Sequence, residues 1–149
     1  MAKQKSSSWW RFQGSTRTLT TSLEGTGSAT AVITSGGLPT LIVDLTSAQA
    51  AKYVDITDKI FGGLDVIDAY SIAGDTTAAS CQVQKYDNSA ASASSISNAI
   101  AKGTTDKGIV SAGTLDDAEW SFTDDDHVRL AITTAAYIGR VVIVFGASG

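Results

Sequence analysis

Short runs in which apolar and polar residues alternate, separated by turn signals, dominate this sequence after residue 28. In residues 40–45, for example, Leu41, Val43 and Leu45 fall on one side of an extended chain. A period of two indicates β-strands that bury one face. The predicted strands are residues 29–34, 40–45, 52–56, 64–73, 78–85, 109–111, 118–122, 127–133 and 138–145. The last is apolar on both faces and is therefore expected at the centre of a sheet.

The composition also favours strands over helices. Ala, Ser, Thr and Gly supply 71 of the 149 residues, whereas glutamate occurs only twice. Helix surfaces usually carry Glu, Lys, Gln and Arg, whereas Thr, Ser and Gly favour strands and turns. One short helix is predicted in residues 88–101, where Ile96, Ala99 and Ile100 have helical spacing behind serines that can cap it. We predict an all-β fold: a jelly-roll-like β-sandwich of about eight strands with one short helix, or a small barrel.

Two of the runs give expectations for individual side chains. In residues 78–85, Cys81 and Val83 are expected inward, so this lone cysteine is predicted to be a small buried hydrophobe. In residues 64–73, four apolar side chains are expected to share one face that Asp68 interrupts. These are Leu64, Val66, Tyr70 and Ile72.

Residues 1–28 show neither the two-residue period of a strand nor the 3.6-residue period of a helix. They are predicted to form an extended N-terminal arm, and residues 29–149 are predicted to form the β-sandwich domain. The first 23 residues carry four cations and no acid, whereas the rest of the chain is acidic and would repel nucleic acid. The aromatic side chains of the arm are too extensive for a solvated tail. They predict docking on the chain's own body or on a neighbour, rather than stacking on a single-stranded nucleic acid. The predicted partner-binding residues are Trp9, Trp10, Arg11, Phe12 and Arg17.

No motif in the chain points to catalysis or to a metal. His127 follows three aspartates, but the spacing matches neither an EF-hand nor a two-histidine site and is typical of a solvated turn. No Gly-x-Ser-x-Gly elbow occurs, and the acids around Glu119 alternate with Trp120 and Phe122 as in a half-buried strand. No stretch approaches the roughly 18 apolar residues of a membrane span. We predict no catalytic residue, no metal ligand, no cofactor and no enzymatic activity.

Four segments resemble, in the same order, parts of tailed-bacteriophage virion proteins, especially capsid decoration (cement) proteins. They are Asp65–Tyr70, Ile96–Ile100, Thr114–Ala118 and Gly139–Phe145. The resemblance implies a jelly-roll-like protein, often trimeric, on the outside of the capsid where major capsid subunits meet.

From this resemblance we predict a structural virion protein that is synthesised in the host cytoplasm and binds the outer capsid surface. As a homotrimer it would stabilise the shell by clamping neighbouring major capsid subunits, with no nucleic acid or membrane as partner. The alternative is a phage tail or fibre component with a receptor- or carbohydrate-binding role, in which Trp120 beside Asp116 and Asp117 would bind the glycan. A third possibility is an oligomeric interaction domain outside phages, because strand patterns determine fold class and not partner.

Overall fold

The computed structural model describes residues 16–24, 27–34, 38–48, 52–58, 61–115, 122–134 and 136–147. These residues form eleven strands and no α-helix, so the all-β prediction is confirmed and the strand number exceeds the predicted eight. No helix among them is long and apolar enough to cross a membrane. The strands are β1 Thr16–Leu23, β2 Ser28–Thr34, β3 Thr40–Ala48, β4 Lys52–Thr57, β5 Leu64–Ala73, β6 Ser80–Asp87, β7 Ser92–Ser95, β8 Ile100–Ala101, β9 Ile109–Ser111, β10 Asp126–Thr134 and β11 Tyr137–Ala147.

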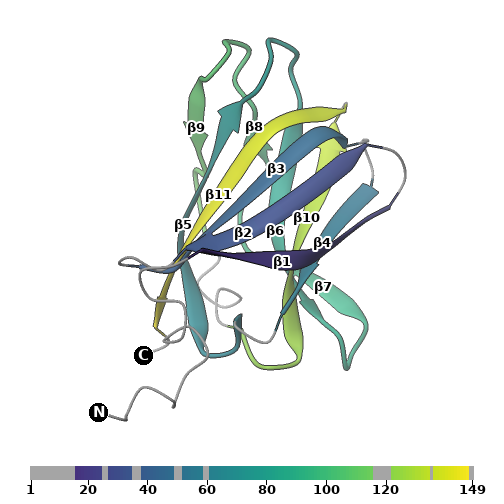
Figure 1. Ribbon diagram of the computed structural model, residues 1–149, viewed down its shortest axis with the longest axis vertical. Coiled ribbons are helices and arrows are strands. Elements are labelled where there is room, and N and C mark those ends of the chain that lie inside the picture. Colours follow the sequence, from purple (N-terminus) through teal and green to yellow (C-terminus); the bar gives the residue numbers. More distant parts are fainter. Residues whose placement is uncertain are drawn as a thin grey trace.

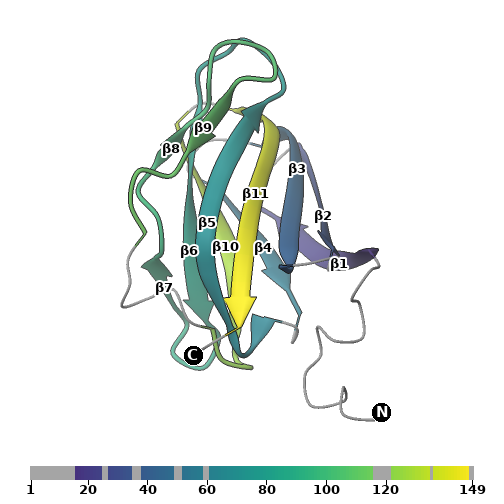
Figure 2. The same ribbon diagram turned by 90° about the vertical axis from the view of Figure 1, so that its left-hand side faces the viewer.

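The strands form two layers with jelly-roll connectivity. The first sheet has the order β2-β3-β11-β5-β9, and the second has β4-β10-β6 with β7 and β8 both paired to the outer edge of β6. Along the chain from β3 to β6, and again from β8 to β11, successive strands belong alternately to the first and the second sheet. Figure 2 shows the two layers face to face. Strand β11 lies between β3 and β5, as its apolar faces predict.

Strand β1 joins the two sheets along one side of the sandwich (Figure 1). Its first half, Thr16 to Leu19, pairs with β2 of the first sheet, and its second half, Thr20 to Leu23, pairs with β4 of the second. This strand corrects the predicted boundary of the arm, because residues 16–23 belong to the sheet. Residues 1–15 lie outside the described part of the chain.

Asn98 joins the sheets along the opposite side. Its side-chain Oδ1 accepts hydrogen bonds from the backbone N–H groups of Gly113 at 2.9 Å and Thr114 at 3.2 Å. A bridge between Ser97 and Leu115 continues this contact. Residues near the edge of the second sheet are therefore bound to residues that follow β9 in the first, and the sandwich is closed on both sides.

The helix predicted in residues 88–101 is wrong. This segment contains a turn and the short strands β7 and β8, and the backbone N–H groups of Ile96 and Ser97 donate to the carbonyl of Val83 in β6. The Ser97 hydroxyl accepts a bond from the Val83 N–H at 3.0 Å. Serine hydroxyls that bond to the backbone compete with helical hydrogen bonds. Ile96 and Ile100 are buried as expected, but along the edge of β6 rather than on a helix face.

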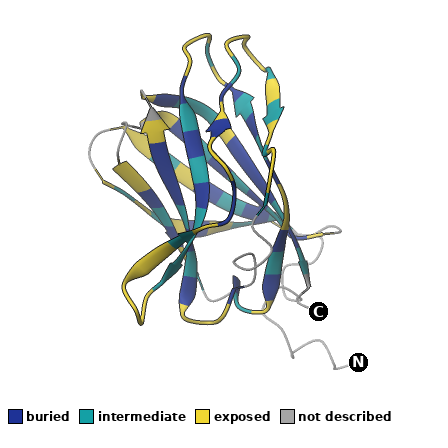
Figure 3. Cartoon of the chain, turned by 180° about the vertical axis from the view of Figure 1, so that it is seen from behind, coloured by how far each residue is buried: buried dark blue, intermediate teal, exposed yellow. Residues whose placement is uncertain are grey.

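The core fills the space between the sheets. Buried and exposed residues alternate along most strands, as the colours of Figure 3 show. Cys81 and Val83 point inward as predicted, and burial raises the pKa of the Cys81 thiol to about 12, so it stays protonated. Three aromatic rings close one end of the core with centroids 5.6 to 6.0 Å apart; they belong to Phe61, Phe122 and Phe145.

A bulge in β5 overturns the prediction that its apolar residues share one face. The register between β5 and β11 shifts at Val144 and Phe145, and both Ile67 and Asp68 are exposed at this point. Leu64 and Val66 consequently face the core. Tyr70 and Ile72, beyond the bulge, instead alternate with buried residues and lie on the outer face.

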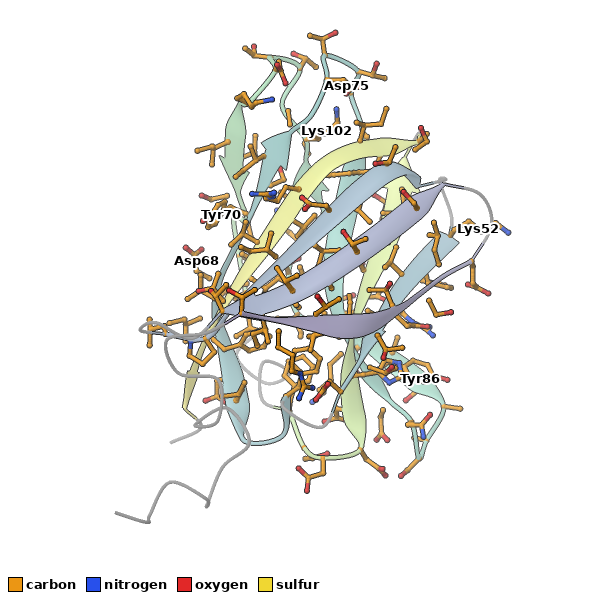
Figure 4. The ribbon with its side chains drawn as sticks, viewed as in Figure 1. Lys52, Asp68, Tyr70, Asp75, Tyr86 and Lys102 are labelled. Atoms are coloured by element: carbon orange, nitrogen blue, oxygen red, sulfur yellow. The ribbon has the colours of Figure 1, made fainter. Side chains whose placement is uncertain are left out.

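A buried ion pair closes the other end of the sandwich. The Lys102 side chain, which follows β8, is completely buried and bonds the carboxylate of Asp75 in the β5–β6 connection. Figure 4 shows the two side chains next to each other. The Lys102 ammonium holds the pKa of Asp75 below its usual value.

We expect Asp75→Ala to lower the melting temperature, because the Lys102 ammonium would stay buried without its carboxylate. The double variant Asp75→Ala/Lys102→Met should recover much of the loss, since a thioether needs no partner. Thermal unfolding followed by circular dichroism measures both. A double variant no more stable than Asp75→Ala would contradict this role of the pair.

Candidate functional site

The outer face of the second sheet carries polar and aromatic side chains from β4, β10 and β6. In register, Arg129 of β10 lies between Asp55 of β4 and Gln84 of β6, and His127 lies opposite Tyr86. Figure 4 labels Tyr86 at this sheet. We call this set the polar face: Tyr53, Asp55, Gln82, Gln84, Tyr86, His127 and Arg129.

Arg129 lies at the centre of the polar face. Its Nε and Nη2 donate to the two carboxylate oxygens of Asp55 at 2.6 and 3.1 Å, which raises the arginine pKa further. The guanidinium carbon lies 4.4 Å from the ring centroid of Tyr53 and 4.0 Å from that of Tyr86, so the cation contacts both rings. A bidentate ion pair between two rings holds these four side chains in fixed positions.

His127 extends this row of stacked groups. Its ring stacks on Tyr86 with the centroids 4.9 Å apart, and its Nε2 lies 3.7 Å from Oδ1 of Asp55, beyond hydrogen-bond distance. Desolvation lowers the pKa of His127 from 6.5, and the Asp55 carboxylate opposes this effect in part. The imidazole is therefore neutral at pH 7.

Unpaired polar atoms also gather on the polar face. Gln82 donates from Nε2 to the carbonyl of Ser97 at 3.0 Å, and Gln84 donates from Nε2 to Oε1 of Gln82 at 3.3 Å. Oε1 of Gln84 and Nε2 of His127 are buried and have no hydrogen-bond partner within the described ranges. A buried polar atom without a hydrogen-bond partner destabilises the folded state, and such atoms are rare in native proteins. Tyr53 is 37% exposed and offers its ring to solvent.

An acidic pocket of about 330 Å³ lies beside the polar face, lined in part by His127, Asp58 and Asp124 to Asp126. The carboxylate of Asp126 accepts bonds from the N–H of Thr123 at 2.8 Å and from its hydroxyl at 3.1 Å. Asp125 accepts a bond from the hydroxyl of Ser89. These two acids therefore stabilise turns. In the described part of the chain, no three His, Cys, Asp or Glu side chains are grouped as a metal site would need.

The outer face of the first sheet is mixed: a group of apolar side chains lies beside threonines and the bidentate ion pair of Arg140 with Asp44. Val32, Ile42, Val142 and Tyr70 form one row across four adjacent strands. Val142 is buried, and the other three side chains of this row are half-buried. Ile109, at the edge strand β9, is 66% exposed. We call this set the apolar face: Val32, Ile42, Tyr70, Ile72, Ile109, Val142 and Val144.

Most of the predicted partner-binding residues lie outside the described residues, namely Trp9, Trp10, Arg11 and Phe12. Arg17 is described: it lies in β1 and forms an ion pair with Asp58. This contact ties Arg17 to the body of the protein. Trp120, which the carbohydrate-binding alternative requires, also lies outside the described ranges.

Sequence reasoning missed the polar face. Alternation places Tyr53 and Asp55 on one side of β4, and His127 and Arg129 on one side of β10. The sequence does not reveal that β4 pairs with β10. This pairing brings Asp55 next to Arg129, which is 74 residues later in the chain. The sequence does contain one indication of the site: polar and aromatic residues occupy the outward positions of three predicted strands.

Comparisons with known proteins gave no family. No family model matches the chain, and neither does any curated protein at a significant level. Several solved structures are weakly similar, among them the following three. The CBM22-1 and GH10 modules of Clostridium thermocellum endo-1,4-β-D-xylanase 10B, complexed with xylohexaose, are 12% identical, with a TM-score of 0.47; the match covers 87% of this chain and 26% of that chain. The chain thus spans about a quarter of the length of that structure.

The C-terminal family 22 carbohydrate-binding module of the same xylanase is 10% identical, with a TM-score of 0.47 and 87% of each chain covered. The N-terminal cellulose-binding domain of Cellulomonas fimi β-1,4-glucanase C is 8% identical, with a TM-score of 0.27, covering 85% of this chain and 80% of that one. Similarities at this level assign neither a family nor a ligand to this chain.

We expect acid to destabilise the protein through His127. Its folded pKa lies below the unfolded value of 6.5, so below that pH the unfolded chain binds more protons and stability falls. Denaturant unfolding from about pH 7.5 to about pH 5.5 should show a larger loss for the unsubstituted chain than for His127→Gln, which cannot titrate. Equal losses in the two proteins would show that His127 is not responsible.

Proposed function

We propose that this chain is a non-catalytic binding module that recognises neutral glycans with its polar face. The observation that carries the proposal is the fixed row of Tyr53, Arg129, Tyr86 and His127 beside two glutamine amides. Because ion pairing and stacking already hold these side chains, binding a ligand costs little of their conformational entropy.

The chemistry of the polar face suits sugars. Glycan hydroxyls both donate and accept hydrogen bonds, and the polar face offers half-buried glutamine side chains and the exposed hydroxyl-bearing ring of Tyr53. Apolar faces of sugar rings pack against aromatic rings, and Tyr53 is exposed enough to contact one. Asp55 and Arg129 cancel each other's charge, and the neighbouring acids Asp124 and Asp125 disfavour an anionic glycan. These features support a neutral ligand.

The arrangement does not suit glycoside hydrolysis. Most glycosidases use two carboxyl groups, one protonated and one ionised, on either side of the scissile bond. The polar face carries a single carboxyl group, that of Asp55, and Arg129 donates hydrogen bonds to both of its oxygens. The proposal is therefore binding without turnover.

Truncating the exposed ring tests the glycan proposal. We expect Tyr53→Ala to weaken binding of a neutral glycan by about tenfold, as expected when an interface aromatic is removed. Screening on a glycan array followed by calorimetry measures the effect. Tyr70→Ala is the matched control, since Tyr70 is a partly exposed tyrosine on the opposite outer face.

Two results would contradict the glycan proposal. One is a complete absence of binding on the array by the folded protein. The other is an equal loss of affinity in Tyr53→Ala and Tyr70→Ala, because a specific effect of the polar face must separate the two variants.

A second proposal is the structural role in a virion, in which the protein clamps major capsid subunits as a homotrimer. The apolar face favours it, because half-buried aliphatic side chains beside the exposed Ile109 suit a protein partner better than a glycan. The resemblance to phage decoration proteins points the same way. The two proposals use opposite outer faces of the sandwich, so variants can separate them.

Co-sedimentation with phage heads tests this second proposal. Ile109→Lys places a charge on an exposed residue of the apolar face and should abolish binding to heads without unfolding the protein. Tyr53→Ala should bind as well as the unsubstituted chain. Failure of the unsubstituted protein to co-sediment, or a monomeric mass in solution, would contradict the clamp.

A further inference from the structure

His127 is the single histidine of the chain, and it lies within the row of stacked side chains on the polar face. Histidine is the side chain whose ordinary pKa places its change of charge between about pH 5 and pH 8. Mild acid therefore adds a positive charge to the polar face at this one side chain.

The imidazole and the guanidinium of Arg129 lie beside the same carboxylate oxygen. Nε2 of His127 lies 3.7 Å from Oδ1 of Asp55, and this oxygen already accepts a hydrogen bond from Nε of Arg129 at 2.6 Å. Nη2 of Arg129 donates to the second oxygen of Asp55 at 3.1 Å. Because the buried Nε2 has no hydrogen-bond partner within the described residues, a proton on it creates a charged donor that competes with Arg129 for Asp55.

Tyr86 brings the same two groups together a second time. Its ring centroid lies 4.0 Å from the guanidinium carbon of Arg129 and 4.9 Å from the centroid of the His127 ring. With a neutral imidazole, Arg129 is the only cation at this ring and Asp55 balances its charge. A protonated imidazole makes the group of Asp55, Arg129 and His127 positive, and its two cations repel each other in a partly desolvated site.

We infer that mild acid opens the polar face, because a protonated His127 displaces Arg129 from Asp55 and so frees the stacked rings of Tyr53 and Tyr86. The opened face binds its ligand more weakly, since the side chains that a ligand contacts are no longer held in place. This loss of affinity rests on the proposed glycan function. The displacement of Arg129 does not, and it can be measured in the protein alone.

The surroundings of His127 determine the direction of this effect. Burial has the largest influence and lowers the pKa of His127; Asp55 and Asp126 oppose burial, and Arg129 adds to it. Tyr86 of β6 covers one side of the ring. Three further acids line the same pocket as His127: Asp58, Asp124 and Asp125. Because these groups together leave the pKa below 6.5, the folded arrangement disfavours the proton, and by linkage the proton disfavours that arrangement.

The side-chain Nε–H signal of Arg129 in nitrogen-15 spectra tests the displacement without a ligand. From about pH 7.5 to about pH 5.5 we expect this signal to move to the position of an exposed arginine, with the same midpoint as the imidazole signals of His127. Arg140 is the matched control, because its Nε and Nη2 bind Asp44 in the same bidentate way at 2.7 and 3.2 Å on the other sheet. An Arg129 signal that stays in place while His127 titrates, or that moves together with the Arg140 signal, would overturn the inference.

The variant His127→Gln, which cannot titrate, assigns the effect to this side chain. Its Arg129 signal should not depend on pH, and a movement as large as in the unsubstituted chain would refute a role of His127.

A glycan array of neutral oligosaccharides, followed by calorimetry at the same pH values, measures the consequence for binding. The affinity of the unsubstituted protein should fall about tenfold for each pH unit below the folded pKa of His127, whereas that of His127→Gln, whatever its size, should not change with pH. Equal affinities of the unsubstituted protein at both pH values would overturn the inferred acid response. An array without signal at either pH would contradict the glycan function instead, and the Arg129 signal then decides whether acid opens the polar face.

Discussion

The rest of the structure depends on the way β1 divides its hydrogen bonds between two sheets. Its first four residues extend the first sheet through β2, and its last four extend the second through β4. Strand β1 thereby connects the two layers on one side of the sandwich, and the hydrogen bonds of Asn98 connect them on the other. With both sides closed, each sheet has one face in the core and one in solvent. Those two solvent faces are the candidate functional surfaces.

The two outer faces differ because different residues occupy the same alternating positions. On β4, β10 and β6 the outward positions hold charged, amide and aromatic side chains, which pair with one another across the strands. On β3, β11 and β5 they hold branched aliphatic residues and a tyrosine together with threonines and the paired Asp44 and Arg140. Burial of the inward residues accounts for folding in both sheets alike. The difference between the outer faces is the basis of the two functions that we propose.

Alternation in the sequence predicted most strands, and it placed β11 at the centre of its sheet because Val142 and Ile143 are both apolar. Prediction from alternation failed where a local contact overrides the two-residue period. The Ser97 hydroxyl bonds to β6 and replaces the predicted helix with strand pairing, and the bulge at Ile67 and Asp68 reverses the facing of Tyr70. The polar face was not predictable, because Asp55 meets Arg129 through strand pairing that a single sequence does not reveal. The N-terminal aromatic residues predicted to bind partners lie outside the described residues and stay a prediction.

If the polar face of β4, β10 and β6 recognises a ligand, as we propose, binding must perturb the residues of that face. A nitrogen-15 titration with the neutral glycan that binds best on an array tests it most directly. We expect chemical-shift changes concentrated at Tyr53, Asp55, Gln84, His127 and Arg129, with the signals of the first sheet unchanged. Shifts concentrated on β3, β11 and β5, or no shifts with any neutral glycan, would contradict it.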